Sequence, residues 1–235
     1  MSSPNSLNLT GTLVNNVRQM IADGILQPGD RLPAERDLAR HLSVDRSSLR
    51  QALKALAVMG VIHQQVGQGT HLLRDASTLL NVPLDFLLLV DGITFAELFE
   101  ARRIFEPELA ARAARRHTPR EITQMQESLT QMSQHAKAGR LAKVAACDQR
   151  FHLLIWKMAG NRVCLRMLAP LHRTMTNSFA VTWSISDYTQ AMGSHAGILD
   201  AIQAGDPDAA RMSMSRHLDG SESILVNAGN RLRSN

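Results

Sequence analysis

The stretch that decides the fold of the N-terminal part runs Val44-Asp45-Arg46-Ser47-Ser48-Leu49-Arg50-Gln51-Ala52-Leu53. Apolar side chains recur in it and just beyond it at the spacing of one helix face: Leu49, Ala52, Leu53 and Leu56. Asp45 stands where an N-cap belongs, and Gly60 can adopt the left-handed backbone of a C-terminal cap. We therefore expect a helix over about 46–59.

Working outward, the neighbouring segments predict the rest of a small domain. An apolar face over 9–25 indicates one helix, and a second, short helix follows Pro33. Two strand-like runs, 61–66 and 70–73, flank a glycine-containing turn and predict a hairpin. Helix, helix, turn, helix and hairpin is the order of a winged helix-turn-helix.

Beyond a junction at about 74–83, every segment has helical periodicity and helical punctuation. Two capping boxes, Thr94 with Glu97 and Thr118 with Glu121, each start a helix. The expected helices cover roughly 94–116, 118–138, 140–159, 162–180, 187–204 and 207–227. We predict a mainly α protein: a winged helix-turn-helix domain over 1–73, a linker over 74–83, and an antiparallel all-helical bundle over 84–235.

The composition agrees with this fold class. Hydrophobic residues make up 44% of the chain but aromatic residues only 4%, which favours helices over sheets. The net charge of +5 allows an anionic partner but does not identify one. No signal peptide is evident, and the longest apolar run, Phe86 to Val90, has the size of a core patch rather than a membrane span. We expect a soluble cytoplasmic protein with no membrane contact.

The first turns of the helix over 46–59 carry the side chains that reading DNA requires. Arg46 and Arg50 are four residues apart, so they share a helix face, and an arginine fork matches guanine or phosphate. Ser47 and Ser48 add hydroxyls that reach phosphate or base, and Arg36 can point toward the same phosphates. The alternative is that these arginines only solvate a helix surface.

The helical half contains one arrangement of metal-ligand types. Asp148 and His152 lie one turn apart on a helix face, and Asp206 lies 11 residues after His195 and 11 before His217. If the two helices fold back on each other at the turn Gly205-Asp206, the imidazoles of His195 and His217 lie side by side. Three imidazoles and a carboxylate suit a divalent ion such as Zn²⁺, with Ni²⁺ and Mn²⁺ as alternatives. The spacing alone leaves an ordinary surface pair open.

The other histidines have no partner at metal-ligand spacing, and we expect them in ordinary surface or core positions: His41, His63, His71, His117, His135 and His172.

Two segments of the N-terminal part resemble the GntR family of transcriptional regulators. They are the run from Pro28 to Ala39, Pro-Gly-Asp-Arg-Leu-Pro-Ala-Glu-Arg-Asp-Leu-Ala, and the stretch 44–53, followed by Gly67-Gln68-Gly69-Thr70. By this resemblance the DNA-contacting positions are Arg36, Arg46, Ser47, Ser48, Arg50 and Gly67 at the wing tip. Two departures, Asp45 in place of Ser or Thr and Gln64-Gln65 in place of a basic pair, predict weaker phosphate attraction.

The helical half resembles the FCD effector-binding domain of the FadR-type branch of that family. The resemblance is carried by Glu100-Ala-Arg-Arg-Ile-Phe-Glu-Pro-Glu-Leu-Ala110 and by the four metal-ligand types Asp148, His152, His195 and His217. It implies a metal site that binds small carboxylates, with Arg102 facing the pocket and able to hold a carboxylate bidentately. The alternative is a solvent-facing arginine, a role we expect for Arg103.

Together these features predict a ligand-controlled repressor and not an enzyme. We expect a homodimer that places two recognition helices in a palindromic double-stranded operator, while an organic acid at the metal changes their separation. A metal-dependent hydrolase fused to a DNA-binding domain is one alternative, although no general base is evident beside the metal-ligand types. A regulator that senses the metal alone is another.

Overall fold

The protein is described by a computed structural model that covers residues 4–65, 67–75, 79–182 and 184–233. The chain divides into two compact units, Met1–Leu79 and Leu80–Asn235. Each unit has its own hydrophobic core.

The N-terminal unit has the predicted order of elements. Helices α1 (Pro4–Ala22), α2 (Glu35–His41) and α3 (Arg46–Val58) precede the strands β1 (Ile62–Gln65) and β2 (Gly69–Leu72). The strands form an antiparallel hairpin in which Ile62 is opposite Leu72 and Gln65 is opposite Gly69. This arrangement confirms the winged helix-turn-helix.

Helix α3 begins and ends as its sequence predicts. The Asp45 carboxylate accepts a hydrogen bond from the Ser48 backbone N–H at 2.9 Å, and Gly60 has a φ of +74°. The apolar face of α3 is buried against α1 and α2, and Leu49 is fully buried. Each leucine buried in this way stabilises the fold by about 1.5–3 kcal/mol relative to an exposed one. The helix is therefore held mainly by its apolar face, and the opposite face is exposed.

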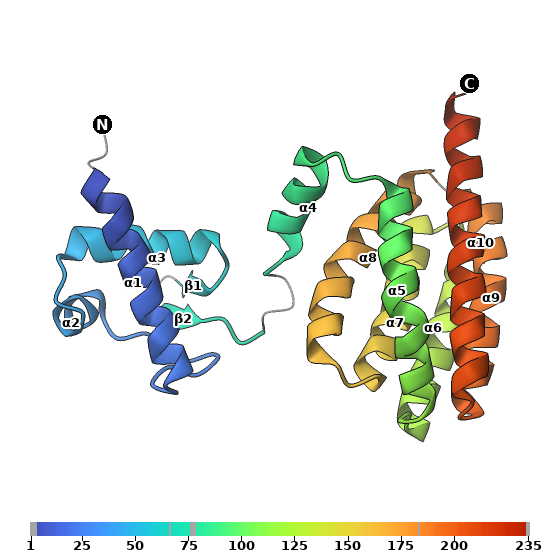
Figure 1. Ribbon diagram of the computed structural model, residues 1–235, viewed down its shortest axis with the longest axis horizontal. Helices are drawn as coiled ribbons and strands as arrows, with labels where there is room; N and C mark the ends of the chain where they lie inside the picture. Colours follow the sequence, from blue (N-terminus) through green and yellow to red (C-terminus); the bar gives the residue numbers. More distant parts are fainter. Residues whose placement is uncertain (1–3, 66, 76–78, 183, 234–235) are drawn as a thin grey trace. The chain divides into compact units, whose positions relative to one another are not determined.

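The second unit is the predicted all-helical bundle. Its helices are α4 (Asn81–Val90), α5 (Phe95–Ala114), α6 (Pro119–Lys137), α7 (Leu141–Met158), α8 (Arg162–Thr182), α9 (Ile185–Gln203) and α10 (Pro207–Arg233). Helix α10 packs along α5 and α9, while α7 packs between α6 and α8 (Figure 1). The centre of the bundle is therefore surrounded by α5, α7, α8, α9 and α10.

Side-chain caps set the starts of several of these helices. Both predicted capping boxes are present, at Thr94 with Glu97 and at Thr118 with Glu121. A third, Ser184 with Asp187, starts α9. Helix α10 continues to Arg233, past the predicted end at 227 and through Gly229.

The run Phe86 to Val90, which has the size of a core patch, is mostly exposed, and only Leu88 in it is buried. This run belongs to α4, which begins inside the predicted linker, and its side chains at 86, 87, 89 and 90 are 50–80% exposed. A helix that is apolar all round can bury only one face in a single contact. Asp85 fixes that face on α8 by hydrogen bonds with Arg173 (2.8 Å) and Thr174 (2.6 Å).

Among the described residues, no helix combines the length and the apolar character that a membrane span requires.

Candidate functional site

The first turn of α3 carries a network around the Asp45 carboxylate. Both hydroxyls that were predicted to reach DNA donate to it, Ser47 Oγ at 2.5 Å and Ser48 Oγ at 2.6 Å. These hydrogen bonds lower the pKa of Asp45 well below its ordinary value. The acid that departs from the family pattern is therefore an ionised helix cap that orients the two serines.

The arginines predicted to contact DNA are exposed on this unit. The Arg50 side chain is 55% exposed, and its guanidinium contacts Glu35 of α2 through Nε and one terminal nitrogen, both at 3.0 Å. Arg36 is 75% exposed and lies 3.7 Å from Asp37. Arg46 is exposed, and Gly67 lies at the exposed tip of the hairpin with a φ of +76°. These cations are free to meet an anionic partner, since surface ion pairs contribute little to folding.

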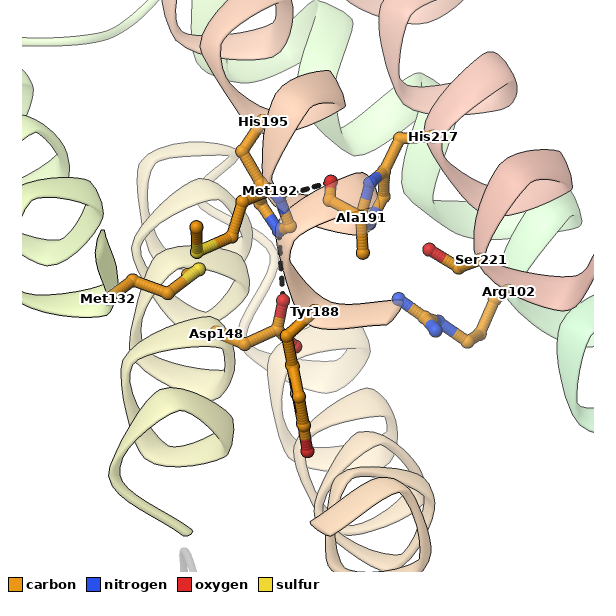
Figure 2. A pocket seen from close by; sticks show the side chains of 9 residues that line it. All are labelled: Arg102, Met132, Asp148, Tyr188, Ala191, Met192, His195, His217 and Ser221. Atoms are coloured by element: carbon orange, nitrogen blue, oxygen red, sulfur yellow. Dashed lines mark hydrogen bonds and ion pairs between the residues drawn. The ribbon is translucent and has the colours of Figure 1, made fainter. Parts of the chain in front are cut away.

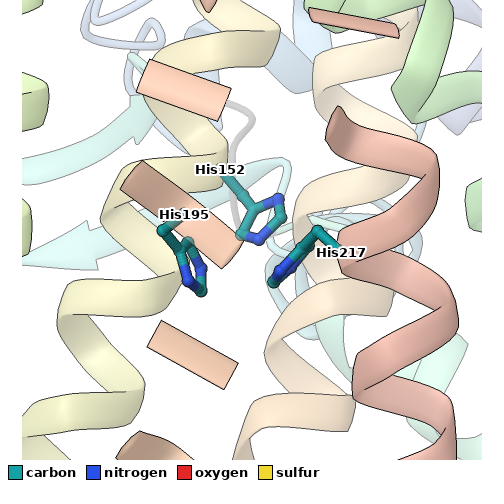
Figure 3. Close-up of side chains that lie close together, drawn as sticks. All are labelled: His152, His195 and His217. Carbon is teal, nitrogen blue, oxygen red and sulfur yellow. The ribbon is translucent and has the colours of Figure 1, made fainter. Parts of the chain in front are cut away.

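The second candidate site lies inside the helical bundle. His152 of α7, His195 of α9 and His217 of α10 converge on one point, and all three are at most 3% exposed (Figure 3). One ligand atom from each lies within 4.8 Å of those of the other two. The Asp148 carboxylate accepts a hydrogen bond from His195 Nε2 at 2.9 Å. The structure thus brings together the four side chains that the spacing and the resemblance singled out.

The protonation states of this cluster suit a divalent cation. Burial lowers the pKa of His217 well below its ordinary value, and the neighbouring His195 and His152 lower it further. Burial alone would raise the pKa of Asp148, but the hydrogen bond from His195 and the nearby imidazoles bring it well below its usual range. A neutral imidazole and an ionised carboxylate are the forms that bind metal.

One buried nitrogen gives a direct indication that a ligand belongs here. His152 Nε2 is buried and has no hydrogen-bond partner among the described residues. The other ring nitrogen, Nδ1, lies 2.9 Å from Glu106 Oε2, which fixes the ring so that Nε2 faces the cluster. A buried polar atom without a partner is costly, and a bound cation would remove that cost. The residues present therefore fit a metal ion.

Glu106 is a functional residue that the sequence analysis missed. It is fully buried on α5 and joins His152 to Arg102, whose Nε donates to Glu106 Oε1 at 2.5 Å. Burial alone would raise the pKa of Glu106, but the charges of Arg102 and His152 hold it below its ordinary value. The available signal was the i, i+4 spacing of Arg102 and Glu106, which places an acid and a base on one helix face.

Arg102 takes the pocket-facing position and not the solvent-facing one. It is 2% exposed, and one of its terminal nitrogens is buried without a hydrogen-bond partner among the described residues. Arg103 is the partly exposed arginine, as expected, and it pairs with Asp219 and Glu222 of α10.

His172 lies in the core, one of the two positions expected for it, and it also borders the cluster, which its sequence spacing did not predict. This α8 side chain is 2% exposed, its ring centre is 4.6 Å from that of His152, and its Nε2 is 3.4 Å from Asp148 Oδ2. Gly160 lies 8 residues after His152 but 12 before His172, so the equal-spacing argument that found His195 and His217 did not apply.

A small cavity opens beside the cluster (Figure 2). The volume that the centre of a water molecule can occupy is about 10 Å³, room for about one water or one ion. Two flexible methionines, Met132 and Met192, line it, so a larger ligand can be admitted by side-chain movement. The remaining lining residues are Arg102, Asp148, Tyr188, Ala191, His195, His217 and Ser221.

Comparisons with known proteins agree with both halves of the chain. The model of bacterial regulatory proteins of the gntR family matches residues 9–72, and that of the FCD domain matches residues 97–220. The HTH-type transcriptional regulator LutR of Bacillus subtilis is 29% identical over 88% of this chain and 96% of its own length. The putative L-lactate dehydrogenase operon regulatory protein of Escherichia coli is 32% identical over 89% of this chain and 83% of its own.

Among solved structures, a GntR protein of Streptococcus agalactiae superposes with a TM-score of 0.70 at 26% identity, covering 90% of this chain and 97% of its own.

Proposed function

The chain belongs to the gntR family of bacterial regulatory proteins, in the branch that carries an FCD domain, and we propose that it is a repressor whose operator binding is controlled by a small carboxylate at a metal site. It is an effector-responsive transcriptional regulator and not an enzyme. The proposal adds the direction of control, the homodimer, the operator symmetry and the metal, and it places the protein in the cytoplasm with the DNA.

Operator recognition is assigned to the exposed face of α3. Arg46 and Arg50 lie on this face, where their guanidinium groups can meet guanine edges or phosphates in the major groove. Arg36 would contact phosphate, and the Gly67 tip of the wing would approach the minor groove. Ser47 and Ser48 exchange their hydrogen bonds with Asp45 for contacts to DNA. Two such helices in a homodimer read the two halves of a palindrome.

Effector binding is assigned to the cluster in the bundle. The observation that carries this assignment is the convergence of three buried imidazoles and a carboxylate around the unpartnered His152 Nε2. Asp148, His152, His195 and His217 would hold Zn²⁺, with Ni²⁺ and Mn²⁺ as alternatives. Such an ion supplies positive charge for a carboxylate. Arg102 would hold the same carboxylate with its free terminal nitrogen.

The effector's chemistry follows from this charge and from the size of the cavity. The metal and Arg102 would attract an acid, and because the free volume of about 10 Å³ holds only about one water, a small organic acid would enter only when Met132 and Met192 move. L-Lactate is the first compound to test, because a relative is named for an L-lactate dehydrogenase operon. The acid controls DNA binding if it binds the DNA-competent and DNA-incompetent forms with different affinity.

Footprinting on the DNA upstream of the chain's own gene tests the recognition half. We expect one protected palindrome at nanomolar to micromolar protein, and protection without symmetry would contradict the dimer. Thermal shift with L-lactate and other small carboxylates, with and without added Zn²⁺, tests the effector half. Stabilisation by a carboxylate that is independent of metal would contradict the metal-centred site.

A regulator that senses the metal alone is the second candidate, and the small size of the cavity favours it. The two are separated by operator affinity measured with metal but without carboxylate. If chelation alone changes the affinity and no carboxylate does, the metal is the signal.

A further inference from the structure

The cluster contains a fourth imidazole, that of His172, besides the three imidazoles and one carboxylate that were predicted to bind the metal. Besides the group formed by His152, His195 and His217, a second group of metal-ligand atoms lies within 4.8 Å of one another: those of Asp148, His152 and His172. The two groups share His152, whose Nε2 is the buried nitrogen without a hydrogen-bond partner. A cation beside that nitrogen would lie at the junction of the two groups, where side chains from both could move onto it.

We propose that His172 is a fifth protein ligand of the metal, an inference that rests on the proposed metal site. Its Nε2 lies 3.4 Å from Asp148 Oδ2, a separation that two ligands of the same ion commonly have, since each is bound at about 2.0–2.2 Å. Its ring centre lies 4.6 Å from that of His152, within the range of 4.3–5.6 Å that relates the other three imidazoles.

The surroundings leave His172 free for this role. Its side chain is 2% exposed, so water does not compete for it. Its Nδ1 has no hydrogen-bond partner among the described residues, so no acceptor locks the ring as Glu106 locks His152. No hydrogen bond at Nδ1 therefore opposes a movement of the ring toward the ion.

A fifth ligand changes what the site prefers. Structural and catalytic Zn²⁺ sites are mostly four-coordinate, whereas four imidazoles and one carboxylate leave a single open position on a six-coordinate ion. The site would then select an octahedral ion with affinity for nitrogen, such as Ni²⁺, over Zn²⁺. An effector carboxylate would bind that ion through one oxygen, and Arg102 would hold the other.

The competing explanation is that His172 only positions Asp148 from outside the coordination sphere. Metal affinity does not separate the two, because losing such a positioning contact also weakens binding by about 10–100-fold. The test must therefore count the imidazoles bound to the ion.

Co²⁺ is a suitable probe because each imidazole bound to it keeps one ring N–H whose proton NMR signal is shifted far from the diamagnetic range. The full chain, with ¹⁵N-labelled histidine and one equivalent of Co²⁺, is compared in H₂O with His172→Gln, which retains a hydrogen-bonding side chain. His135→Gln, on α6 and outside both groups, is the matched control. Burial of the rings protects the N–H groups from exchange.

Four shifted ring N–H signals in the wild type and the control, and three in His172→Gln, are the expected result. Three signals in the wild type that persist in His172→Gln would overturn the fifth ligand and leave the four-donor site intact. The absence of shifted signals in every protein would overturn the metal site itself. The wild-type count stands even if the variant folds poorly.

Discussion

Glu106→Gln is the substitution that tests the buried network most sharply. The side chain of Glu106 is fully buried and that of Arg102 is 3% exposed, so water cannot replace a lost charge. Glutamine has nearly the same shape and still offers an oxygen to His152 Nδ1. What it removes is the negative charge that faces the Arg102 guanidinium.

The expected cost follows from that isolation. Removing one partner of a buried ion pair costs about 3–5 kcal/mol, because the other charge is left uncompensated. For a unit of this size, 1 kcal/mol corresponds to about 2–4 °C, so the melting temperature should fall by about 6–20 °C. The His152 ring should also be held less firmly, and metal affinity should fall by about 10–100-fold.

Tryptophan fluorescence is the assay that isolates the helical unit. The chain has two tryptophans, Trp156 and Trp183, and both belong to the unit Leu80–Asn235. Melting is followed in the presence of a chelator, so that metal does not add to the stability. Glu108→Gln is the matched control, since it removes a carboxylate from the same helix but from the exposed pair with Arg211. We expect no measurable change there.

A Glu106→Gln protein that melts within 2 °C of the wild type (about the effect of 1 kcal/mol or less) and binds metal as tightly would refute this reasoning. It would mean that Arg102 finds water or another anion, and that His152 does not depend on Glu106 for its orientation.

Two further predictions concern DNA binding and the pH dependence of stability. Arg50→Ala should abolish operator binding measured by fluorescence anisotropy and leave the tryptophan melting curve unchanged, because Arg50 is exposed and belongs to the other unit; retained operator affinity would remove Arg50 from the DNA-contacting set. In the metal-free protein, stability should fall as the pH is lowered from about 7 to 5. The pKa values of His172 and His217 are lower in the folded state than their ordinary value of about 6.5 in the unfolded chain. Below about pH 6.5 these two side chains therefore bind protons in the unfolded chain but not in the folded one, and a falling pH favours unfolding. Each imidazole that stays neutral contributes up to about 1.4 kcal/mol per pH unit. Urea denaturation at several pH values measures this, and a slope that is the same in His217→Gln would contradict the assignment.

The sequence allowed most of the fold to be predicted, because its local signals agree with one another. Asp45, Gly60 and the two threonine capping boxes mark helix boundaries through backbone hydrogen bonds that form within a few residues. The exposure of the run Phe86 to Val90 could not be predicted, because hydrophobicity without periodicity does not say which face is covered. That information resides in tertiary contacts such as those of Asp85 with α8.

The site was predictable where spacing encodes geometry and not elsewhere. The proximity of Asp148 to His152 follows from one helix turn, and that of His195 to His217 follows from one helical hairpin. His172 and Glu106 reach the same point from α8 and α5, through the packing of helices whose offset no spacing rule fixes. Long-range packing therefore added Glu106 and His172, whereas the four predicted donors followed from local spacing.

The most direct test of the account is the operator affinity of the full chain, loaded with metal, as a function of L-lactate or of whichever small carboxylate the thermal-shift screen identifies. Operator anisotropy is measured in the wild type and in His195→Ala, with His117→Ala as a control histidine outside the metal-ligand groups. We expect the carboxylate to shift operator affinity about 5–150-fold in the wild type and the control and not at all in His195→Ala. An equal shift in His195→Ala would contradict control through the metal site.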